Sequence, residues 1–171
     1  MTSSFRPVLG LLLGLGSLAL AGRAEGGTIQ VPAQYPTIQR AIDAAVDGDV
    51  VLVKAGIYQP AATLDTLGKA ITIEGEVAVD GTPLTIIDGR DAITVLQCTS
   101  GENSNTIFEN LVIRNGRAAQ AGGGMLILNA SSPSLVNCSF IDNESACYGG
   151  AVASISQGFP CNPFADPTRL R

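Results

Sequence analysis

Histidine and tryptophan are absent from this 171-residue sequence, and only 15% of its residues are charged. The absence of histidine excludes histidine-dependent nucleophilic triads and histidine-ligated zinc, and it removes the commonest general base at neutral pH. An average globular sequence is about 25% charged, so the low charge argues against a disordered chain or a coiled coil. The length predicts one folded domain, because a domain usually takes about 100 to 200 residues.

Basic residues are few as well. The sequence has 10 lysines and arginines against 15 acidic residues, a formal net charge of −5 at pH 7. Nucleic acids and anionic lipids would be repelled by such a surface. We therefore expect no nucleic-acid partner.

Residues 1–24 have the three-part layout of a secretory signal peptide. A short polar start that contains Arg6 precedes an apolar run from Val8 to Ala21, and small residues end the segment. The alternative is a membrane anchor, but the run is shorter than the roughly 20 residues that a spanning helix needs. We expect cleavage, a secreted or cell-envelope location (extracellular, periplasmic or outer surface), and no integral membrane span after processing.

Four cysteines follow, at positions 98, 138, 147 and 161, with no C-x-x-C pair and no histidine beside them. A zinc site is therefore not expected. An oxidising compartment would permit disulfides, and three pairings of Cys98, Cys138, Cys147 and Cys161 are open. Buried free thiols are the alternative for Cys98 and Cys138, which lie in apolar strand patterns.

Three segments superpose when the sequence is shifted by 27 residues: 83–89, 110–116 and 137–143. The apolar matches are two residues apart, which predicts one inward face of a strand. In this register Leu84 lies beneath Leu111, and Ile86 beneath Ile113. At the following turn Asp88, Asn115 and Asp142 align, and we expect them to form a ladder of stacked side chains.

Strands and bends that return at this period predict an all-β parallel β-helix of about four or five stacked coils, spanning residues 28–156. The apolar stretches 50–53 and 70–73 have the β-branched composition of earlier strands. Residues 37–46 have helical spacing, and we expect a short helix there that caps the N-terminal end, with Thr37 as N-cap. The residues expected to face the stack are Ile38, Ala41, Ile42, Ala45 and Val46.

Residues 157–171 contain three prolines, so they predict an irregular C-terminal tail rather than another coil. Two interpretations are open. The tail is a loop laid over the last coil and tied by a bond between Cys147 and Cys161, or the chain is truncated. An uncovered last coil would favour self-association.

The segments 35–45 (YPTIQRAIDAA), 47–53 (DGDVVLV) and 55–58 (AGIY) resemble the N-terminal cap and first coil of pectin-lyase-like right-handed parallel β-helix proteins. The resemblance continues through 71–73 and 86–89. It implies a right-handed coil and residence outside the cytoplasm. The resemblance does not imply a single activity. The family includes pectate lyases, pectin methylesterases and polygalacturonases, and it also includes adhesins and repeats without known catalysis.

The segment 140–143 (FIDN), followed by 149–152 (GGAV), resembles the FxxN and GGA(I/L/V) repeat pair of polymorphic outer membrane proteins. Asn115 and the segment 122–125 form a degenerate earlier copy. We expect these glycines to permit close packing of coils, because no Gly-Lys-Ser/Thr follows that would indicate a phosphate loop.

Candidate chemistry rests on six side chains: Asp88, Asp91, Glu102, Glu109, Arg114 and Asp142. An enzyme of this fold would need carboxylates or an arginine together on one outer face, because glycosidic hydrolysis uses two carboxyls at a fixed separation. Turn formation is the competing explanation, since Asp and Asn bond to nearby backbone groups. No residue is assigned a catalytic, cofactor-binding or metal-binding role, and Ca²⁺ is expected only if the chain is an enzyme.

The sequence favours an exported, non-catalytic β-helix repeat protein that acts as a cell-surface or extracellular scaffold, in adhesion or glycan contact. Its partners would be polysaccharides or cell-surface molecules. The alternative is a carbohydrate-active enzyme, a polysaccharide lyase or glycoside hydrolase, or a fragment of one. Convergence of carboxylates with Arg114 in a groove would favour the enzyme, and carboxylates dispersed singly over the turns would favour the scaffold.

Overall fold

The computed structural model describes residues 26–156. The predicted signal peptide (1–24) and the predicted tail (157–171) lie outside the described residues, and both stay predictions. The described chain is built mainly of short strands in parallel sheets with one helix, α1, which confirms the all-β prediction at that level.

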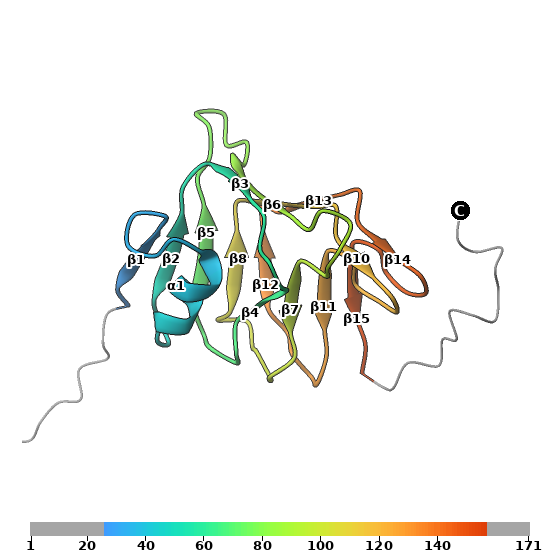
Figure 1. Cartoon of the computed structure of the whole chain (residues 1–171). Helices are drawn as coiled ribbons and strands as arrows, with labels where there is room; N and C mark the ends of the chain where they lie inside the picture. Colours follow the sequence, from blue (N-terminus) through green and yellow to red (C-terminus); the bar gives the residue numbers. More distant parts are fainter. Residues whose placement is uncertain (1–25, 157–171) are drawn as a thin grey trace, which may run out of the picture.

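Three parallel sheets form the body of the molecule (Figure 1). Sheet A contains β1 (Thr28–Val31), β2 (Val50–Val53), β5 (Thr72–Gly75), β8 (Ile107–Glu109) and β12 (Ser134–Val136). Sheet B contains β3 (Gly56–Tyr58), β6 (Thr85–Asp88), β9 (Leu111–Arg114) and β13 (Ser139–Ile141). Sheet C contains β4 (Leu64–Asp65), β7 (Leu96–Cys98), β11 (Met125–Ile127) and β15 (Val152–Ser154). A separate pair joins β10 (Arg117–Ala118) to β14 (Glu144–Ser145).

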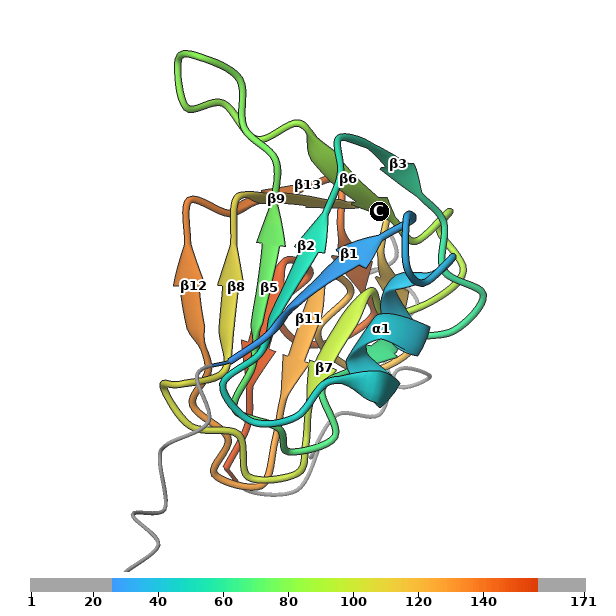
Figure 2. The same cartoon turned by 90° about the vertical axis from the view of Figure 1, so that its left-hand side faces the viewer.

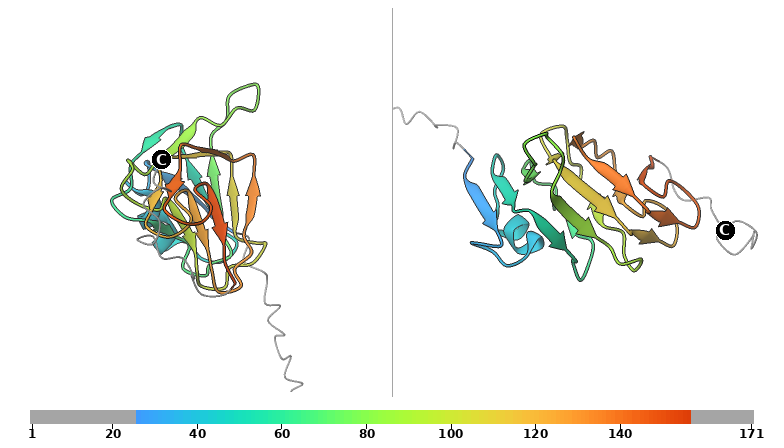
Figure 3. Two further views of the ribbon diagram at one scale, coloured as in Figure 1. Left: turned by 90° about the vertical axis from the view of Figure 1, so that its right-hand side faces the viewer. Right: turned by 90° about the horizontal axis from the view of Figure 1, so that it is seen from above.

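The chain visits sheets A, B and C in the same order each time, and we call one such circuit a pass. The passes begin with β2, β5, β8 and β12, and each strand pairs in parallel with the strand of the same sheet in the next pass. Figure 2 and the right-hand view of Figure 3 show the passes side by side in sequence order. Each sheet stays open, with an edge strand at either end.

Alternation along each strand explains why these residues stack. In sheet A the inward side chains Val51, Ile73 and Phe108 are paired in register and buried. Successive side chains of a strand point to opposite faces, so each strand contributes every second residue to the interior. The result is one continuous apolar core that runs through all passes.

The predicted register between the first two repeat segments is wrong by one residue. Thr85 pairs with Leu111 and Ile87 with Ile113, so the inward residues of β6 are Thr85 and Ile87. Leu84 is 43% exposed and precedes the strand. A shift of one residue moves every side chain of a strand to the opposite face, and Leu84 and Ile86 therefore do not stack in the interior.

The passes differ in length, and this difference explains the error. Asp88 at the end of β6 pairs with Arg114, which comes 26 residues later in the sequence. In the next pass, the hydrogen-bonded residues Gly116 and Asn143 are 27 residues apart. The 27-residue repeat holds between β9 and β13, where Ile113 pairs with Phe140. The predicted register came from aligning the turn residues Asp88 and Asn115, which are 27 residues apart, but the strand pairing of β6 with β9 has a spacing of 26 residues.

The predicted N-terminal helix is present as α1 (Ile38–Ala44), slightly shorter than 37–46. Thr37 is the N-cap, as predicted, and its Oγ1 accepts a hydrogen bond from Arg40 N–H at 3.3 Å. The side chains Ile38, Ala41, Ile42 and Ala45 are buried, but Val46 is 63% exposed because the helix has already ended. The Lys69 ammonium donates to two carbonyls of the last turn, those of Ile42 and Asp43.

Strand β1 comes before the helix and was not predicted. It pairs along its whole length with β2, with Val31 opposite Val53. The sequence TIQV has partial alternation, and Val31 is fully buried. Together β1 and α1 lie against the first pass at the N-terminal end (Figure 1).

A hairpin excursion projects from the corner between β5 and β6 (Figure 2). An antiparallel bridge joins Val77 to Pro83, and Leu84 N–H donates to the Glu76 carbonyl at its base. Val79 at its tip is fully exposed. The second pass is therefore lengthened outside the stack, without any change in the strand pairing.

Candidate functional site

Two of the six candidate side chains, Asp88 and Arg114, are in contact at the corner between sheets B and C. Asp88 ends β6 and Arg114 ends the neighbouring strand β9, with Arg114 Nη2 2.9 Å and Nε 3.0 Å from Asp88 Oδ2. Asp88 Oδ1 accepts from Arg90 N–H and from the Asn115 amide. Both carboxylate oxygens are therefore already bonded within the protein.

Burial raises the pKa of Asp88, but the hydrogen bonds from Arg90 N–H, Asn115 and Arg114, with the charge of Arg114, outweigh it. The net result is a pKa below the ordinary value, so Asp88 is ionised at neutral pH. A carboxylate in this state is a poor proton donor. The ion pair between Asp88 and Arg114 links the second pass to the third.

Asp91 and Asp142 lie at the same corner but are exposed. Both have left-handed backbone conformations, with φ of 54° and 50°, as residues in tight turns often do. The predicted ladder is formed in part: Asp88 bonds to Asn115, whereas Asn143, not Asp142, continues the contact, because its side chain accepts from Gly116 N–H and donates to the Ile113 carbonyl.

Glu102 is 1% exposed and lies at the corner between sheets C and A. Its Oε1 accepts from Thr66 Oγ1 and Gly68 N–H, both at 2.9 Å. Its Oε2 accepts from Ser100 N–H at 2.9 Å and from Ser131 Oγ at 2.8 Å. The carboxylate thus joins the corners of three successive passes.

No cationic side chain is among these four donors. Burial raises the pKa of Glu102, but the hydrogen bonds from Ser100 N–H, its own N–H, Ser131 and Gly68 N–H together lower it below its ordinary value. A buried carboxylate that accepts several backbone hydrogen bonds is held in its charged form. Glu102 is therefore committed to the structure, and no carboxylate oxygen is directed at solvent.

Glu109 differs from the other candidates because it lies on the outer face of sheet A. It follows buried Phe108 in β8, so it points away from the core, and its register partner in β5 is Glu74. Adjacent strands lie about 4.8 Å apart, so the two carboxylates are neighbours on one face. Glu74 was not among the predicted residues, although its place between Ile73 and Gly75 in an alternating strand indicates an outward side chain.

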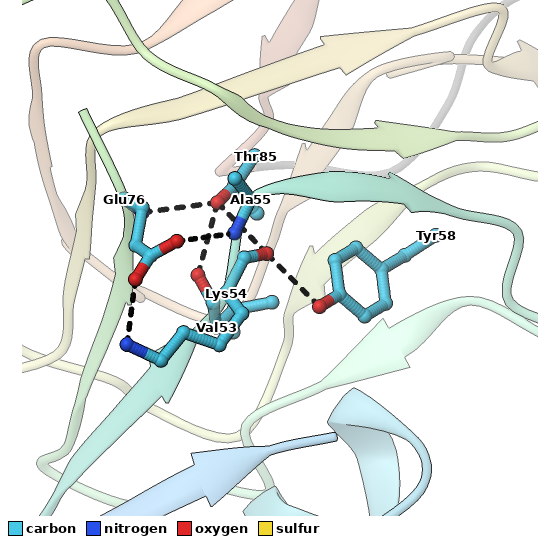
Figure 4. A network of polar contacts seen from close by, with 6 residues as sticks. All are labelled: Val53, Lys54, Ala55, Tyr58, Glu76 and Thr85. Atoms are coloured by element: carbon cyan, nitrogen blue, oxygen red, sulfur yellow. Dashed lines mark hydrogen bonds and ion pairs between the residues drawn. The ribbon is translucent and has the colours of Figure 1, made fainter. Parts of the chain in front are cut away.

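A polar network occupies the corner between sheets A and B (Figure 4). Glu76 accepts from Lys54 Nζ at 2.6 Å and from Ala55 N–H at 2.8 Å, and Tyr58 donates to the Lys54 carbonyl at 2.9 Å. The hydrogen bonds from Lys54 and Ala55 lower the pKa of Glu76. Partial burial, with the charge of Glu76, raises the pKa of Tyr58.

The buried hydroxyl of Thr85 completes this network. It donates to the Val53 carbonyl at 2.9 Å and accepts from Glu76 N–H at 3.0 Å (Figure 4). Both of its hydrogen-bonding roles are used, which explains how a polar side chain occupies an inward position. This corner too joins neighbouring passes.

An asparagine pair that was not predicted stacks at the same edge of the molecule. Asn110 and Asn137 follow β8 and β12, have φ of 58° and 47°, and bond through Asn137 Nδ2 and Asn110 Oδ1 at 2.8 Å. Asn137 also donates to the Gly81 carbonyl of the hairpin excursion. The 27-residue alignment places these two asparagines at the head of two repeat segments, so the signal was present in the sequence.

The glycine segment 122–124 permits close approach of backbones, as predicted. A Cβ on Gly123 would collide with the Glu144 carbonyl oxygen, and one on Gly124 would lie 2.8 Å from the ring of Phe140. Substitution at Gly122 would also be strained, because its φ is 67°. The segment therefore packs one pass on the next.

The cysteines divide into two kinds. Cys98 and Cys138 are free thiols, as the alternative interpretation held, and Cys147 is disulfide-bonded. Burial raises the pKa of Cys98 to about 12, and burial also raises that of Cys138. Neither thiol is an activated nucleophile, since reactivity requires the thiolate. Cys161 lies outside the described residues, and its bond to Cys147 stays a prediction.

Within residues 26–156, no three histidine, cysteine, aspartate or glutamate side chains are grouped as metal ligands. The helix in this part of the chain, α1, has 7 residues, and no helix there has the length and apolarity to cross a membrane.

Four of the six predicted side chains share one corner, and two lie elsewhere. Asp88 and Arg114 are in contact there, with Asp91 and Asp142 exposed nearby, whereas Glu102 is buried at another corner and Glu109 lies on sheet A.

Comparison with known proteins gives no match: no protein-family model, curated protein or solved structure is similar to this chain.

Proposed function

We propose that this chain is an exported, non-catalytic right-handed parallel β-helix repeat protein. Its role is that of a secreted or cell-envelope scaffold that contacts polysaccharides or other surface molecules. The fixed order in which the chain visits sheets A, B and C supports the β-helix, since each pass then corresponds to one coil. The cap-like sequence at 35–58, folded as a helix followed by β2 and β3, supports the assignment to a right-handed coil.

One observation carries the scaffold role: three of the six candidate side chains, Asp88, Glu102 and Arg114, bond to neighbouring passes. Arg114 bonds to Asp88, and Glu102 accepts from donors of three passes. A catalytic carboxylate needs an oxygen free to reach a substrate proton or carbon. Groups that are saturated by the protein supply cohesion between coils instead.

Binding and cleavage assays test this proposal directly. The secreted chain is incubated with a panel of neutral and acidic polysaccharides, with and without Ca²⁺, and binding and release of new reducing ends are measured. We expect retention on at least one polysaccharide or cell-wall preparation with no release of ends. Sustained turnover would refute the non-catalytic role.

Export is tested separately by the mass of the protein recovered outside the cell or from the envelope. We expect loss of residues 1–24 in the mature chain. Recovery of the uncleaved chain in the cytoplasm would contradict this part of the proposal.

A carbohydrate-active enzyme is the second candidate, and the pair Glu74 and Glu109 specifically favours it. Retaining glycosidases hold two carboxyl groups about 5 to 5.5 Å apart, close to the spacing of adjacent strands. If polysaccharide cleavage is detected, Glu74→Gln and Glu109→Gln should each reduce it at least a hundredfold. Glu144→Gln, an exposed glutamate on β14, is the matched control and should leave the rate unchanged.

A further inference from the structure

Asn115 is the one asparagine of the sequence that is followed by glycine. Asparagine is a thermolabile residue, and a following glycine makes it more so, because the glycine nitrogen can approach the side-chain carbonyl carbon without hindrance from a Cβ. Attack by that nitrogen releases ammonia, and water opens the resulting succinimide ring to aspartate or isoaspartate. In a folded chain the reaction depends on what holds the two reacting groups.

The glycine nitrogen is held by the fourth pass. Gly116 N–H donates to Asn143 Oδ1 at 2.8 Å, and the Asn143 amide donates in turn to the Ile113 carbonyl at 2.9 Å. The Gly116 carbonyl accepts from Glu144 N–H at 2.8 Å. Gly116 is buried, and a Cβ at this position would collide with the Gly123 carbonyl oxygen. The nitrogen is therefore bonded and shielded from the base that must remove its proton.

The side chain of Asn115 is held by the second pass. Its Nδ2 donates to Asp88 Oδ1 at 3.1 Å. Its backbone is fixed as well, because its N–H donates to the Ile141 carbonyl at 3.2 Å and its carbonyl accepts from Asp91 N–H at 2.7 Å. Ring closure would require the side chain to turn from Asp88 towards the Gly116 nitrogen, so the bond to Asp88 must break first.

We propose that Asn115 is a latent self-modification site, which the contact between the third and fourth passes keeps inactive. When Asn143 leaves Gly116, the Gly116 nitrogen loses its proton to hydroxide and bonds to Asn115 Cγ. The Cγ–Nδ2 bond then breaks, and Nδ2 takes a proton from water and leaves as ammonia. Water adds to either carbonyl of the ring and gives aspartate or isoaspartate. Water is the one reactant consumed, and no oxidation or reduction takes place.

The modified residue would keep the passes from closing again. Aspartate places a second carboxylate where the Asn115 amide donated to Asp88, and two carboxylates in contact repel each other. Isoaspartate also routes the backbone through the side chain, between an N–H that bonds to Ile141 and a carbonyl that bonds to Asp91. A reversible opening of the stack therefore becomes permanent. This inference does not depend on the scaffold role, because it concerns only the contacts between passes.

Peptide mapping by mass spectrometry tests the site in the wild-type chain at mildly alkaline pH. Deamidation of Asn115 should be at least a hundredfold slower in the folded chain than in guanidinium chloride. Asn103, which is exposed and precedes serine, is the internal control and should differ only severalfold between the two states. Equal rates for Asn115 in the folded and unfolded chain would overturn the proposal.

A series of guanidinium concentrations separates the opening of the fourth pass from global unfolding. The rate at Asn115 should begin to rise below the midpoint of global unfolding and with a smaller slope, because separation of two passes exposes less surface than unfolding of the whole chain. A rate that rises only together with global unfolding would show that the contact with the fourth pass does not control the reaction.

Substitution of Asn143 tests the contact itself. Asn143→Ala should raise the rate at Asn115 at least tenfold under native conditions, whereas Asn143→Asp keeps an oxygen that accepts from Gly116 N–H and should stay slow. Asn137→Ala is the matched control, since it removes an asparagine of the same pass that bonds to Asn110, and it should leave the rate unchanged. Equal rates in the two alanine variants would refute the role of Asn143. The wild-type measurements decide the question even if Asn143→Ala does not fold.

Hydrogen exchange tests the consequence of the modification. Asn115→Asp reproduces one of the two products, and it should raise the exchange rate of the Gly116 amide at least tenfold. Asn103→Asp makes the same change at an exposed position and should have no effect on this amide. Unchanged exchange in Asn115→Asp would show that the passes close normally after modification and would overturn this part of the proposal.

Discussion

Replacement of Glu102 with glutamine should lower the free energy of unfolding by about 3 kcal/mol. Each oxygen of the Glu102 carboxylate accepts one hydroxyl and one backbone N–H, from Thr66 and Gly68 on one side and from Ser131 and Ser100 on the other. The glutamine amide must place its NH₂ group on one of these sides. A hydroxyl can rotate to accept from it, but a backbone N–H cannot.

One backbone donor is therefore left without an acceptor in either orientation of the amide. A buried donor without a partner costs about 1 to 3 kcal/mol, and the remaining bonds lose the strength that the charge gave them, about 1 kcal/mol more. With a urea m-value of about 2 kcal/mol/M, the midpoint of unfolding should fall by about 1.5 M. The melting temperature should fall by roughly 6 to 12 °C.

Urea unfolding followed by circular dichroism measures this change. Glu74→Gln is the matched control, since it makes the same chemical change on the outer face of sheet A, and it should alter stability by less than about 0.5 kcal/mol. The double variant with Ser131→Ala should lose less than the sum of the two single variants, because both residues belong to one network. Equal stability of the Glu102 and Glu74 variants would refute the reasoning.

Three further predictions follow from the buried groups and the packing of the passes. The folded-state pKa of Glu102 is below its ordinary value of 4.5. The contribution of the Glu102 carboxylate to stability is therefore complete above that pH and is lost as the pH falls through the folded pKa. Between pH 7 and pH 2, the melting temperature of Glu102→Gln should decline less steeply than that of the wild-type chain. Cys98 should not react with a thiol reagent in the native protein, and Cys138 should react more slowly than a free thiol, because burial raises both pKa values; rapid labelling of both before unfolding would contradict this. Gly123→Ala should cost about 2 kcal/mol or more through collision with the next pass, whereas Gly27→Ala, whose Cβ meets only ordinary contacts, should be nearly neutral in the same unfolding experiment.

The capping helix and strand β2 could be predicted because their side-chain periods are local. Thr37 and the apolar residues at helical spacing mark α1, and the alternating β-branched residues around Val51 mark β2. Strand β1 was missed because its alternation covers only four residues. Its burial depends on β2 and α1, which come later in the chain.

The register of β6 could not be obtained from the repeat alone. Similar turn residues align Asp88 with Asn115, but the strand pairs Asp88 with Arg114, because the turn after β6 takes a different path with Arg90 and Asp91 both at positive φ. The inward position then falls on Thr85, a polar residue whose hydroxyl is bonded to the Val53 carbonyl. A polar side chain at this inward position is favourable only because of that tertiary hydrogen bond.

The candidate site was predicted in its residue types but not in their roles. Asp88 and Arg114 are neighbours because the strands that end in them are paired. The burial of Glu102 depends on donors from three separated turns, which no local pattern specifies. Glu74 and Glu109 are adjacent only through the pairing of β5 with β8, across a separation that does not match the 27-residue repeat.

The hairpin at residues 76–84 has a consequence for how such a chain can change during evolution. Its added length leaves the stack at a corner and returns to it, so the strands on either side keep their partners. Sequence can therefore be gained or lost at this position with little effect on folding, while the tip acquires new binding preferences. A foreign peptide inserted beside Val79 should be displayed on the exterior of an otherwise unaltered protein, which makes this corner a natural grafting site.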